Sequence, residues 1–112
     1  MRLITAIIQP AALPAVTESL REIGIRGMTV TEVSGYGRQR GHTEVYRGSE
    51  YVVDRIDKTK VEILAEAVDE AVIIERIVAA AGTGRIGDGK VWTTEVGTVV
   101  RVRTGERDAD AL

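Results

Sequence analysis

The pattern of apolar and polar positions predicts that the chain begins with a strand, a helix and a second strand. Residues 3–8 form an almost continuous apolar run, which indicates a buried strand. From 13 to 23 the apolar residues recur at helical spacing, where Pro14 suits the first turn of a helix and Gly24 its end. Residues 28–33 alternate and are rich in threonine and valine, which is typical of a strand.

The second half of the chain follows a similar order. Residues 61–64 predict a short strand, and the apolar stripe after them predicts a second helix that Asp69 caps and two glycines end. Residues 90–94 and 98–103 are predicted to be a last pair of extended segments. The tail, 104–112, is polar and is expected to be loosely held.

This order of elements, β-α-β-β-α-β with a short extra strand, predicts an α+β domain with the ferredoxin-like split βαβ arrangement over residues 1–112. Right-handed crossovers place both helices on one face of the sheet. The other face is then open, although the predicted strands carry apolar residues on both sides. A large uncovered apolar face is unusual in a soluble monomer, so we expect that oligomerisation covers it.

One segment breaks this pattern. Residues 36–55 join two strands that a loop of 2–5 residues would normally connect as a hairpin. The segment mixes several arginines with acidic residues. Long loops of this kind are commonly functional, and a floppy insertion is the alternative interpretation.

Composition narrows the class of protein. The 112 residues are 44% hydrophobic and 29% charged, which is typical of a globular domain, and the net charge of −2 does not favour nucleic acid as a partner. There is no cysteine, so disulfides and cysteine metal sites are excluded and a reducing cytoplasm is expected. No apolar run approaches the roughly 20 residues that span a bilayer, and the N-terminus does not look like a signal peptide.

Two glycine-rich stretches invite a nucleotide interpretation. Residues 35–41 lack a Rossmann fingerprint, because Arg40 stands at the third glycine and no helix is expected to follow. Residues 84–91 satisfy G-x-x-x-x-G-K, but Val91 replaces the Ser or Thr of a Walker A loop and the order of helix and strand is reversed. Backbone N–H groups at 87–89 can still cradle an anion beside Lys90, and a plain turn is the alternative.

A pair of arginines adds positive charge. Arg101 and Arg103 are two positions apart and would share one face of the predicted strand, with Val100 and Val102 facing the core. Two guanidiniums on a fixed strand form a good phosphate clamp, although a surface ion pair is the common alternative for any isolated arginine. Together with Lys90, they indicate a polyphosphate site.

Catalytic groups are scarce. His42 is the one histidine, with no cysteine or second histidine for a metal site and no evident serine–aspartate partner for a triad. We therefore expect that the protein is not an enzyme. Two alternatives stay open: a nucleotide-using ferredoxin-like transferase, which would need a base or nucleophile, and an RNA-binding ferredoxin-like module, which would need aromatic residues on its sheet.

Several motifs resemble those of one family. YRGSEY at 46–51, TGRIGDGKVW at 83–92, the long stretch at 27–48 and VVRVRTGE at 99–106 are similar to the signatures of the PII nitrogen-regulatory signalling proteins. The resemblance extends over residues 1–112. It implies a homotrimer of ferredoxin-like subunits with nucleotide clefts between neighbours, in which 36–55 is the protruding T-loop.

The resemblance also implies ligands and partners. The family binds ATP or ADP competitively, and 2-oxoglutarate together with Mg-ATP. The implied partners are an ammonium transporter, nitrogen-metabolism enzymes or regulators, and a nucleotidyltransferase, with no nucleic acid and with membrane contact only through the transporter. The T-loop is implied to control these partners.

Site residues follow from the same resemblance. Those implied to bind nucleotide are Gly27, Met28, Thr29, Gly35, Gly37, Arg38, Glu62, Leu64, Gly87, Asp88, Gly89, Lys90, Arg101 and Arg103, with Glu62 paired to the Lys90 ammonium. Those implied to bind 2-oxoglutarate are Gln39, Lys58 and Gly87, with Gln39 also meeting magnesium. Tyr51 is implied to be the site of uridylylation or adenylylation.

Several positions depart from the family pattern, among them Arg55 and Gly82, which stand where an apolar and a basic residue are usual. Gln9 stands where a basic residue is common, so 2-oxoglutarate binding is expected to weaken. Asp57 adds an acid beside Lys58 in the sequence.

Overall fold

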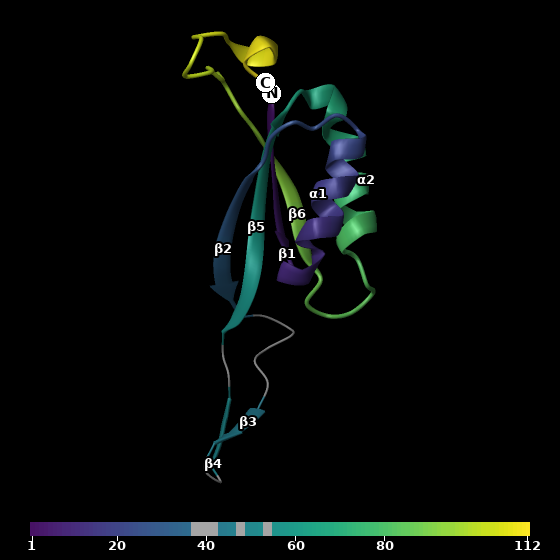
Figure 1. Cartoon of the computed structure of the whole chain (residues 1–112), viewed down its shortest axis with the longest axis vertical. Coiled ribbons are helices and arrows are strands. Elements are labelled where there is room, and N and C mark those ends of the chain that lie inside the picture. The colour runs from purple at the N-terminus through teal and green to yellow at the C-terminus, as the bar shows by residue number, and fades with distance from the viewer. Residues whose placement is uncertain (37–42, 47–48, 53–54) are drawn as a thin grey trace.

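The computed structural model describes the backbone of residues 1–36, 43–46, 49–52 and 55–112, and the side chains of 1–36 and 55–112. Within these residues, six strands and two helices follow one another (Figure 1). In order they are β1 (Arg2–Ile8), α1 (Leu13–Glu22), β2 (Thr29–Gly35), β3 (Thr43–Tyr46), β4 (Ser49–Val52), β5 (Ile56–Ala65), α2 (Glu70–Ala81) and β6 (Gly89–Glu95), with single 3-10 turns at Pro10–Ala12, Ala67–Asp69 and Asp108–Ala111.

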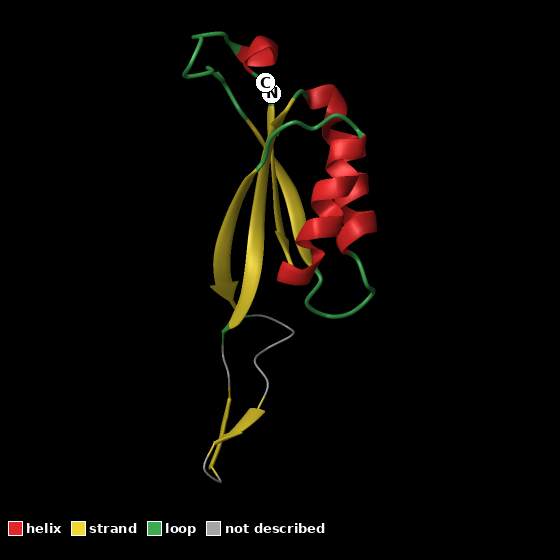
Figure 2. Ribbon diagram, viewed as in Figure 1, coloured by secondary structure: helices red, strands yellow, loops and turns green. Residues whose placement is uncertain are grey.

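The main sheet has four strands in the order β2-β5-β1-β6, and every neighbouring pair is antiparallel. Both helices lie on one face of this sheet (Figure 2). The predicted ferredoxin-like split βαβ arrangement is therefore confirmed. β1 lies between β5 and β6, so the N-terminal strand is central in the sheet and pairs with two strands from the second half of the chain.

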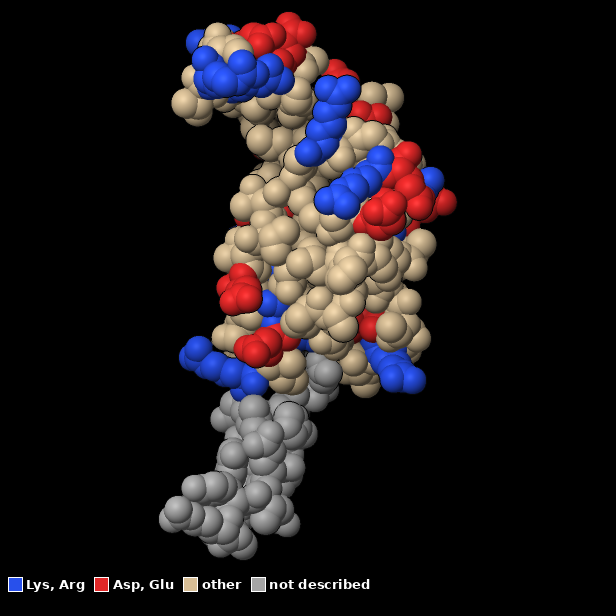
Figure 3. All heavy atoms as spheres, viewed as in Figure 1, with Lys and Arg blue, Asp and Glu red and all other residues tan. Residues whose placement is uncertain are grey.

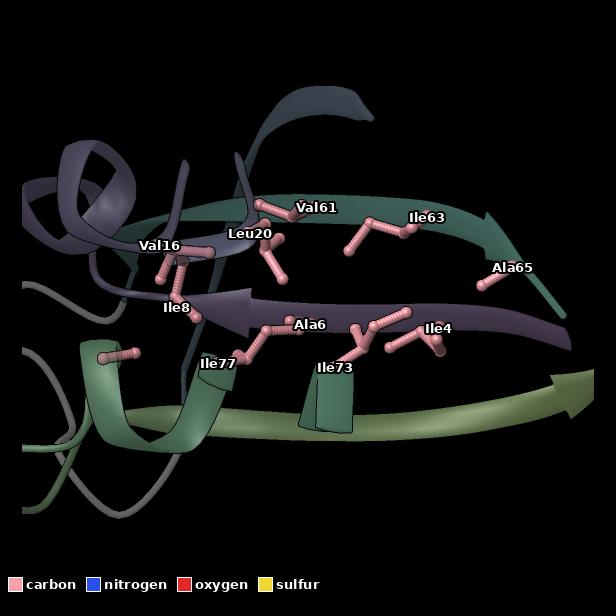
Figure 4. Packing of buried hydrophobic residues seen from close by; sticks show 11 residues of the cluster. Ile4, Ala6, Ile8, Val16, Leu20, Val61, Ile63, Ala65, Ile73 and Ile77 are labelled. Carbon is pink, nitrogen blue, oxygen red and sulfur yellow. The ribbon is translucent and has the colours of Figure 1, made fainter. Parts of the chain in front are cut away.

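The core fills the space between the sheet and the helices (Figure 4). Alternation along β1 turns Ile4, Ala6 and Ile8 toward the helices, and each is at most 2% exposed. Facing residues come from β5, α1 and α2. The full cluster is Ile4, Ala6, Ile8, Val16, Leu20, Val61, Ile63, Ala65, Ile73, Ile77 and Ala81. Burial of each large aliphatic side chain contributes about 1.5–3 kcal/mol, which makes this layer the main source of stability.

The helix ends agree with the sequence except at one cap. Pro14 lies in the first turn of α1, and Gly24 follows its end with φ +88°, a conformation that favours glycine. Asp69 precedes α2 as predicted, but its side chain forms no capping hydrogen bond. The 3-10 turn Ala67–Asp69 leads into the helix instead, and Asp69 N donates to Glu66 O at 3.0 Å.

None of the described elements covers the second face of the main sheet (Figure 2). The side chains on this open face alternate with those of the core and include Leu64 and Trp92, which are 42% and 46% exposed. Lys58, Lys60 and Glu62 of β5 share the face. The uncovered face that the sequence predicts is therefore present, and its covering by further copies remains an expectation.

The prediction of a strand at 98–103 is wrong. In this region the chain leaves the sheet (Figure 1), and the pairing it makes is a single bridge between Val100 and Arg107. Val102, predicted to face the core, is fully exposed, and Val100 is 46% exposed. Valine alternation indicates a surface that another element can cover, but no edge of the described sheet lies alongside to pair with it.

The tail, residues 104–112, contains regular structure and backbone hydrogen bonds, although it was expected to be loosely held. Residues 108–111 form a 3-10 turn, and Asp108 N donates to Val99 O at 2.8 Å. Asp108 is in the left-handed region with φ 52°, which an aspartate tolerates better than most residues. We call residues 98–112 the C-terminal arm.

The long segment at 36–55 contains regular structure that its composition did not indicate. β3 and β4 form an antiparallel hairpin in which Thr43 pairs with Val52 and Tyr46 with Ser49. Figure 1 shows the hairpin beyond the ends of β2 and β5, away from both helices. In the described part of the chain, no helix is long and apolar enough to cross a membrane.

Candidate functional site

Most of the predicted site residues whose side chains are described line one of two cavities, which share no lining residue. The Gly87 cavity, about 560 Å³, lies at the end of the sheet where β2 finishes and β6 begins. The Thr29 cavity, about 810 Å³, lies at the end where β2 begins. Of the predicted residues, the first contains Gly35, Lys58, Gly87, Asp88, Gly89 and Lys90, and the second contains Gly27, Met28, Thr29, Glu62 and Leu64.

The Gly87 cavity is lined by both apolar and charged side chains. Ile7 of β1 and Trp92 of β6 come from the open face of the sheet, opposite the core. Lys58, Arg85 and Lys90 supply positive charge. Such a mixture suits a ligand with one flat apolar part and one anionic part. Sequence reasoning missed the contributions of Ile7, Arg85 and Trp92, since nothing local marks them.

The loop between α2 and β6 is organised by one carboxylate. Asp88 Oδ2 accepts hydrogen bonds from the backbone N–H groups of Thr83 at 2.7 Å and Gly84 at 2.9 Å, and Asp88 Oδ1 accepts from Thr83 Oγ1 at 2.6 Å. The hydrogen bond from the Thr83 hydroxyl is the largest of the causes that lower the pKa of Asp88. The Asp88 side chain therefore stabilises the loop. Because its carboxylate is used in this way, the predicted contact of Asp88 with phosphate is expected from its backbone N–H group.

Gly89 is required by close packing. Its φ is +110°, and an added Cβ would overlap the carbonyl oxygen of Ile7 on the neighbouring strand. Gly87 also has positive φ, at +101°. Gly89, which sequence reasoning assigned to an anion cradle, thus lets the start of β6 lie directly against β1. Whether this backbone binds an anion stays a prediction.

Lys58 crosses the Gly87 cavity to the same loop. Its Nζ donates to the carbonyl oxygen of Gly87 at 2.6 Å. Burial lowers the pKa of Lys58, and the Asp88 carboxylate acts in the opposite direction. Asp57, which precedes Lys58 in the sequence, belongs to the opposite face of β5, because neighbouring strand residues alternate. The charge that acts on Lys58 is that of Asp88.

The Thr29 cavity combines backbone of the α1–β2 connection with side chains of β5. Thr29 pairs with Glu62 across the two strands. The Glu62 carboxylate lies 3.7 Å from Lys60 Nζ, so the predicted pairing with Lys90 is not made within the described chain. Ala111 and Leu112 also line the cavity. Sequence reasoning missed both because the tail was expected to be loose.

The two predicted arginines lie on the C-terminal arm. Arg101 Nη1 donates to Glu106 Oε1 at 2.9 Å, and Arg101 Nη2 donates to the carbonyl oxygen of Leu112 at 2.8 Å. Arg103 is exposed. Neither arginine lines either cavity, but Leu112 connects Arg101 to the Thr29 cavity. Figure 3 shows basic and acidic side chains intermixed over this arm, at the end of the molecule opposite the hairpin.

The separation of the two cavities follows from strand geometry. On β2, Thr29 belongs to one cavity and Gly35 to the other, six residues further along. At about 3.3 Å per residue these positions are roughly 20 Å apart. The two groups of predicted residues therefore line separate cavities toward opposite ends of one sheet face.

Comparison with known proteins gives the family. The family model for nitrogen regulatory protein P-II matches residues 1–106. The nitrogen regulatory protein P-II of Azospirillum brasilense is 55% identical over 112 residues, which is the whole of both chains. Those of Rhizobium meliloti strain 1021 and Escherichia coli K12, the latter named P-II 1, are 53% and 51% identical over the same full length. The chain belongs to the P-II family.

Membership of the P-II family supports a role in nitrogen-regulatory signalling. The relatives are named as regulatory proteins and not as enzymes, which fits the scarcity of catalytic groups in the sequence. Among the described residues no group of three or more histidine, cysteine, aspartate or glutamate side chains could hold a metal ion. The magnesium ion that the resemblance implies stays a prediction.

Part of the P-II site falls outside the described residues. These predicted positions are Gly37, Arg38 and Gln39. Tyr51 lies on β4, where its backbone pairs with Glu44, but its side chain is outside the description. Gln9 follows the end of β1 and does not line the Gly87 cavity. The expected effect of Gln9 on 2-oxoglutarate binding stays a prediction.

Proposed function

We propose that this P-II protein senses ATP, ADP and 2-oxoglutarate, and controls partner proteins through the segment at 36–55. The observation that carries the proposal is the division of the predicted nucleotide residues between two cavities at opposite ends of one open sheet face. A complete site then needs the Gly87 cavity of one copy and the Thr29 cavity of a neighbour. A closed ring of copies provides such a cleft at every interface, and the family resemblance makes it a trimer.

Two glycines support a site between copies. Within one chain, a Cβ added to Gly27 or Gly35 would meet no atom within 4 Å, and neither glycine has positive φ. Their absence of a side chain is therefore not explained by the fold of a single chain. A glycine in or beside a strand is favoured where a ligand or another backbone approaches closely.

The cations fit a nucleotide with its phosphates directed toward Lys90. Gly27, Met28 and Thr29, which the resemblance places on the adenine side, line the Thr29 cavity, and Lys90 in the Gly87 cavity suits a phosphate. Arg101 and Arg103, contributed from the arm of the neighbouring copy, would complete the anion site. Both nucleotides carry a diphosphate, so ATP and ADP would compete for the same cleft.

Mixed assemblies test the composite site directly. Lys90→Ala and Arg103→Ala should each weaken ATP binding in calorimetry. If the two residues act from different copies, reassembling equal amounts of both variants leaves about one cleft in four with both cations intact. ATP binding at wild-type affinity should then return at that stoichiometry. Equal loss in the mixture and in each variant alone, or a monomeric mass in light scattering, would count against the proposal.

The effector would bind next to the nucleotide. Lys58 Nζ already donates to Gly87 O in the Gly87 cavity, and this ammonium would turn to a 2-oxoglutarate carboxylate. A dianion beside a triphosphate needs a metal ion between them, so 2-oxoglutarate should bind only with Mg-ATP. Calorimetry with and without nucleotide tests this, and equal affinity in both conditions contradicts it. Gln9→Lys should tighten effector binding.

Partner control would depend on the segment at 36–55 and on its modification. Tyr51, on strand β4, is the proposed acceptor of a uridylyl or adenylyl group. A phosphodiester there changes the local charge and thereby partner binding. Mass spectrometry of protein from its native cells, under nitrogen starvation and after ammonium shock, tests this assignment. A nucleotidyl group on Tyr46, which faces Ser49 across the hairpin, would overturn it.

A further inference from the structure

The two arginines of the C-terminal arm differ in their contacts. Arg103 is exposed, and among the described residues no ion pair includes it. Arg101 is held at both terminal nitrogens: Nη1 by the Glu106 carboxylate at 2.9 Å and Nη2 by the carbonyl oxygen of Leu112 at 2.8 Å. Its side chain retains 31% exposure. Arg103 is therefore available to a ligand, whereas Arg101 already donates to two acceptors of its own chain.

The contact between Arg101 and Glu106 is built into a local turn. Arg101 N donates to Glu106 O and Gly105 N donates to Arg101 O, both at 2.8 Å. Gly105 has φ +74°, which closes the turn without a side-chain clash. Because five residues separate the two partners, the carboxylate returns to the guanidinium at little entropic cost. The pair does not need a second copy or a ligand to form.

A guanidinium binds carboxylates and phosphates with the same donors. The Glu106 carboxylate accepts from a terminal nitrogen of Arg101, one of the donors with which an arginine would hold a phosphate. Leu112 adds a connection to the binding space, because it accepts from Arg101 and also lines the Thr29 cavity. A ligand in the Thr29 cavity would therefore contact Leu112, whose carbonyl oxygen accepts the hydrogen bond from Arg101.

We infer that Glu106 is a specificity-determining residue, an internal anion that competes with ligand phosphates for Arg101. This inference rests on the proposed function, which places Arg101 in the nucleotide site. A phosphate that takes the Nη1 donor of Arg101 must displace Glu106, whereas a ligand without phosphate leaves the pair intact. Glu106 therefore lowers the affinity for polyphosphates selectively and keeps their release easy.

The exchange is expected to be modest in size. Half of the Glu106 side chain is exposed, at 48%, and ion pairs at such positions are weak. Removing the competing charge should tighten a polyphosphate by roughly two- to fivefold. An internal anion of this strength tunes the affinity of the site and does not block it.

Substitution of Glu106 tests the inference in the full-length protein. Calorimetry would compare adenosine, ADP and ATP on the wild type and on Glu106→Gln, which removes the charge and keeps the backbone bonds of the turn. Asp110→Asn is the matched control, because it removes the same charge from the same arm at a residue with no side-chain bond to Arg101. We expect roughly two- to fivefold tighter ADP and ATP in Glu106→Gln, unchanged adenosine, and wild-type values for Asp110→Asn.

Three results would overturn the inference. Weaker ADP and ATP binding in Glu106→Gln would show that the carboxylate positions Arg101 for the ligand. Unchanged binding would show that the pair does not compete, and equal tightening in Asp110→Asn would reduce the effect to net charge. In each case the wild type still binds nucleotide and the proposed function stands. A wild type that binds neither ADP nor ATP would instead overturn the proposed function and this inference together.

Discussion

The loop between α2 and β6 and the C-terminal arm both carry cations that the sequence assigns to phosphate, yet they differ in what holds them. The loop is fastened by its own chain: Asp88 accepts three hydrogen bonds from Thr83 and Gly84, and Gly89 lies against Ile7. The arm has one isolated bridge and a valine that is fully exposed.

This difference shows that some sequence patterns specify a structure within one chain, whereas others specify only a surface that must be covered. Glycines with positive φ and an acid five residues from a threonine specify a turn by local chemistry alone. Alternating valines specify only that some surface must cover them. The loop is therefore complete in one chain, whereas the arm looks like half of an interface.

The largest expected effect tests whether the loop is as rigid as its contacts indicate. Gly89→Ala forces a methyl group into the Ile7 carbonyl and strains a φ of +110°, so we expect a loss of about 3 kcal/mol in the free energy of unfolding. Gly97→Ala is the control, because its added Cβ meets nothing within 4 Å. Urea unfolding measures both. Similar midpoints for the two variants would mean that the loop yields easily.

The next effect tests whether the arm is recruited to ligand. Arg103→Ala removes a charge-assisted contact of about 1.5–3 kcal/mol and should weaken ATP binding roughly 10- to 150-fold in calorimetry. Arg107→Ala removes the same charge from the same arm and should change affinity by less than about twofold. Equal effects of the two substitutions would assign the arm a general electrostatic role.

A smaller effect tests whether the arm is half of an interface. Val102 is fully exposed in one chain, so Val102→Asp should leave the unfolding of that chain almost unchanged. If a neighbour covers it, the assembly loses about 1.5–3 kcal/mol of burial and dissociates at higher concentration. Val68→Asp, at a position 83% exposed beside α2, is the control. Light scattering over a dilution series distinguishes them, and identical curves would leave the arm without an interface.

The smallest effect concerns the pKa of Asp88. Its hydrogen bonds lower this pKa below the usual 3.8, so their stabilisation is complete above that value and is lost as the pH falls through the lowered pKa. Thr83→Val removes the hydroxyl donor and should raise the pKa of Asp88 toward 3.8. NMR titration of the Asp88 carboxyl measures it, with Thr98→Val as control. An unchanged pKa would mean that the backbone donors suffice.

The sequence predicts the fold well because periodicity reports burial. The strand predicted at 3–8 is observed as β1, Arg2–Ile8, and the second helix ends before Gly82 as expected. β5 was underestimated: 61–64 was predicted and Ile56–Ala65 is observed. Lys58 and Lys60 interrupt the apolar run because they lie on the open face, where charged side chains are tolerated.

The site was predictable only where neighbouring residues form it. Gly87, Gly89 and Lys90 lie together in sequence and in space, so a motif is enough to find them. The division into two cavities depends on the distance along β2, and the bonds of Arg101 depend on a turn that replaced the expected strand. Neither the two cavities nor the bonds of Arg101 can be predicted from a motif of neighbouring residues in the sequence.

The position of Trp92 makes this protein its own optical reporter. It is the one tryptophan of the chain, it is 46% exposed, and it lies on the open sheet face in the wall of the Gly87 cavity. Filling that cavity or covering that face removes water from the indole, which shifts its fluorescence to shorter wavelength. Ligand entry and assembly can thus be followed in the unlabelled wild-type protein, in real time and at concentrations far below those of calorimetry.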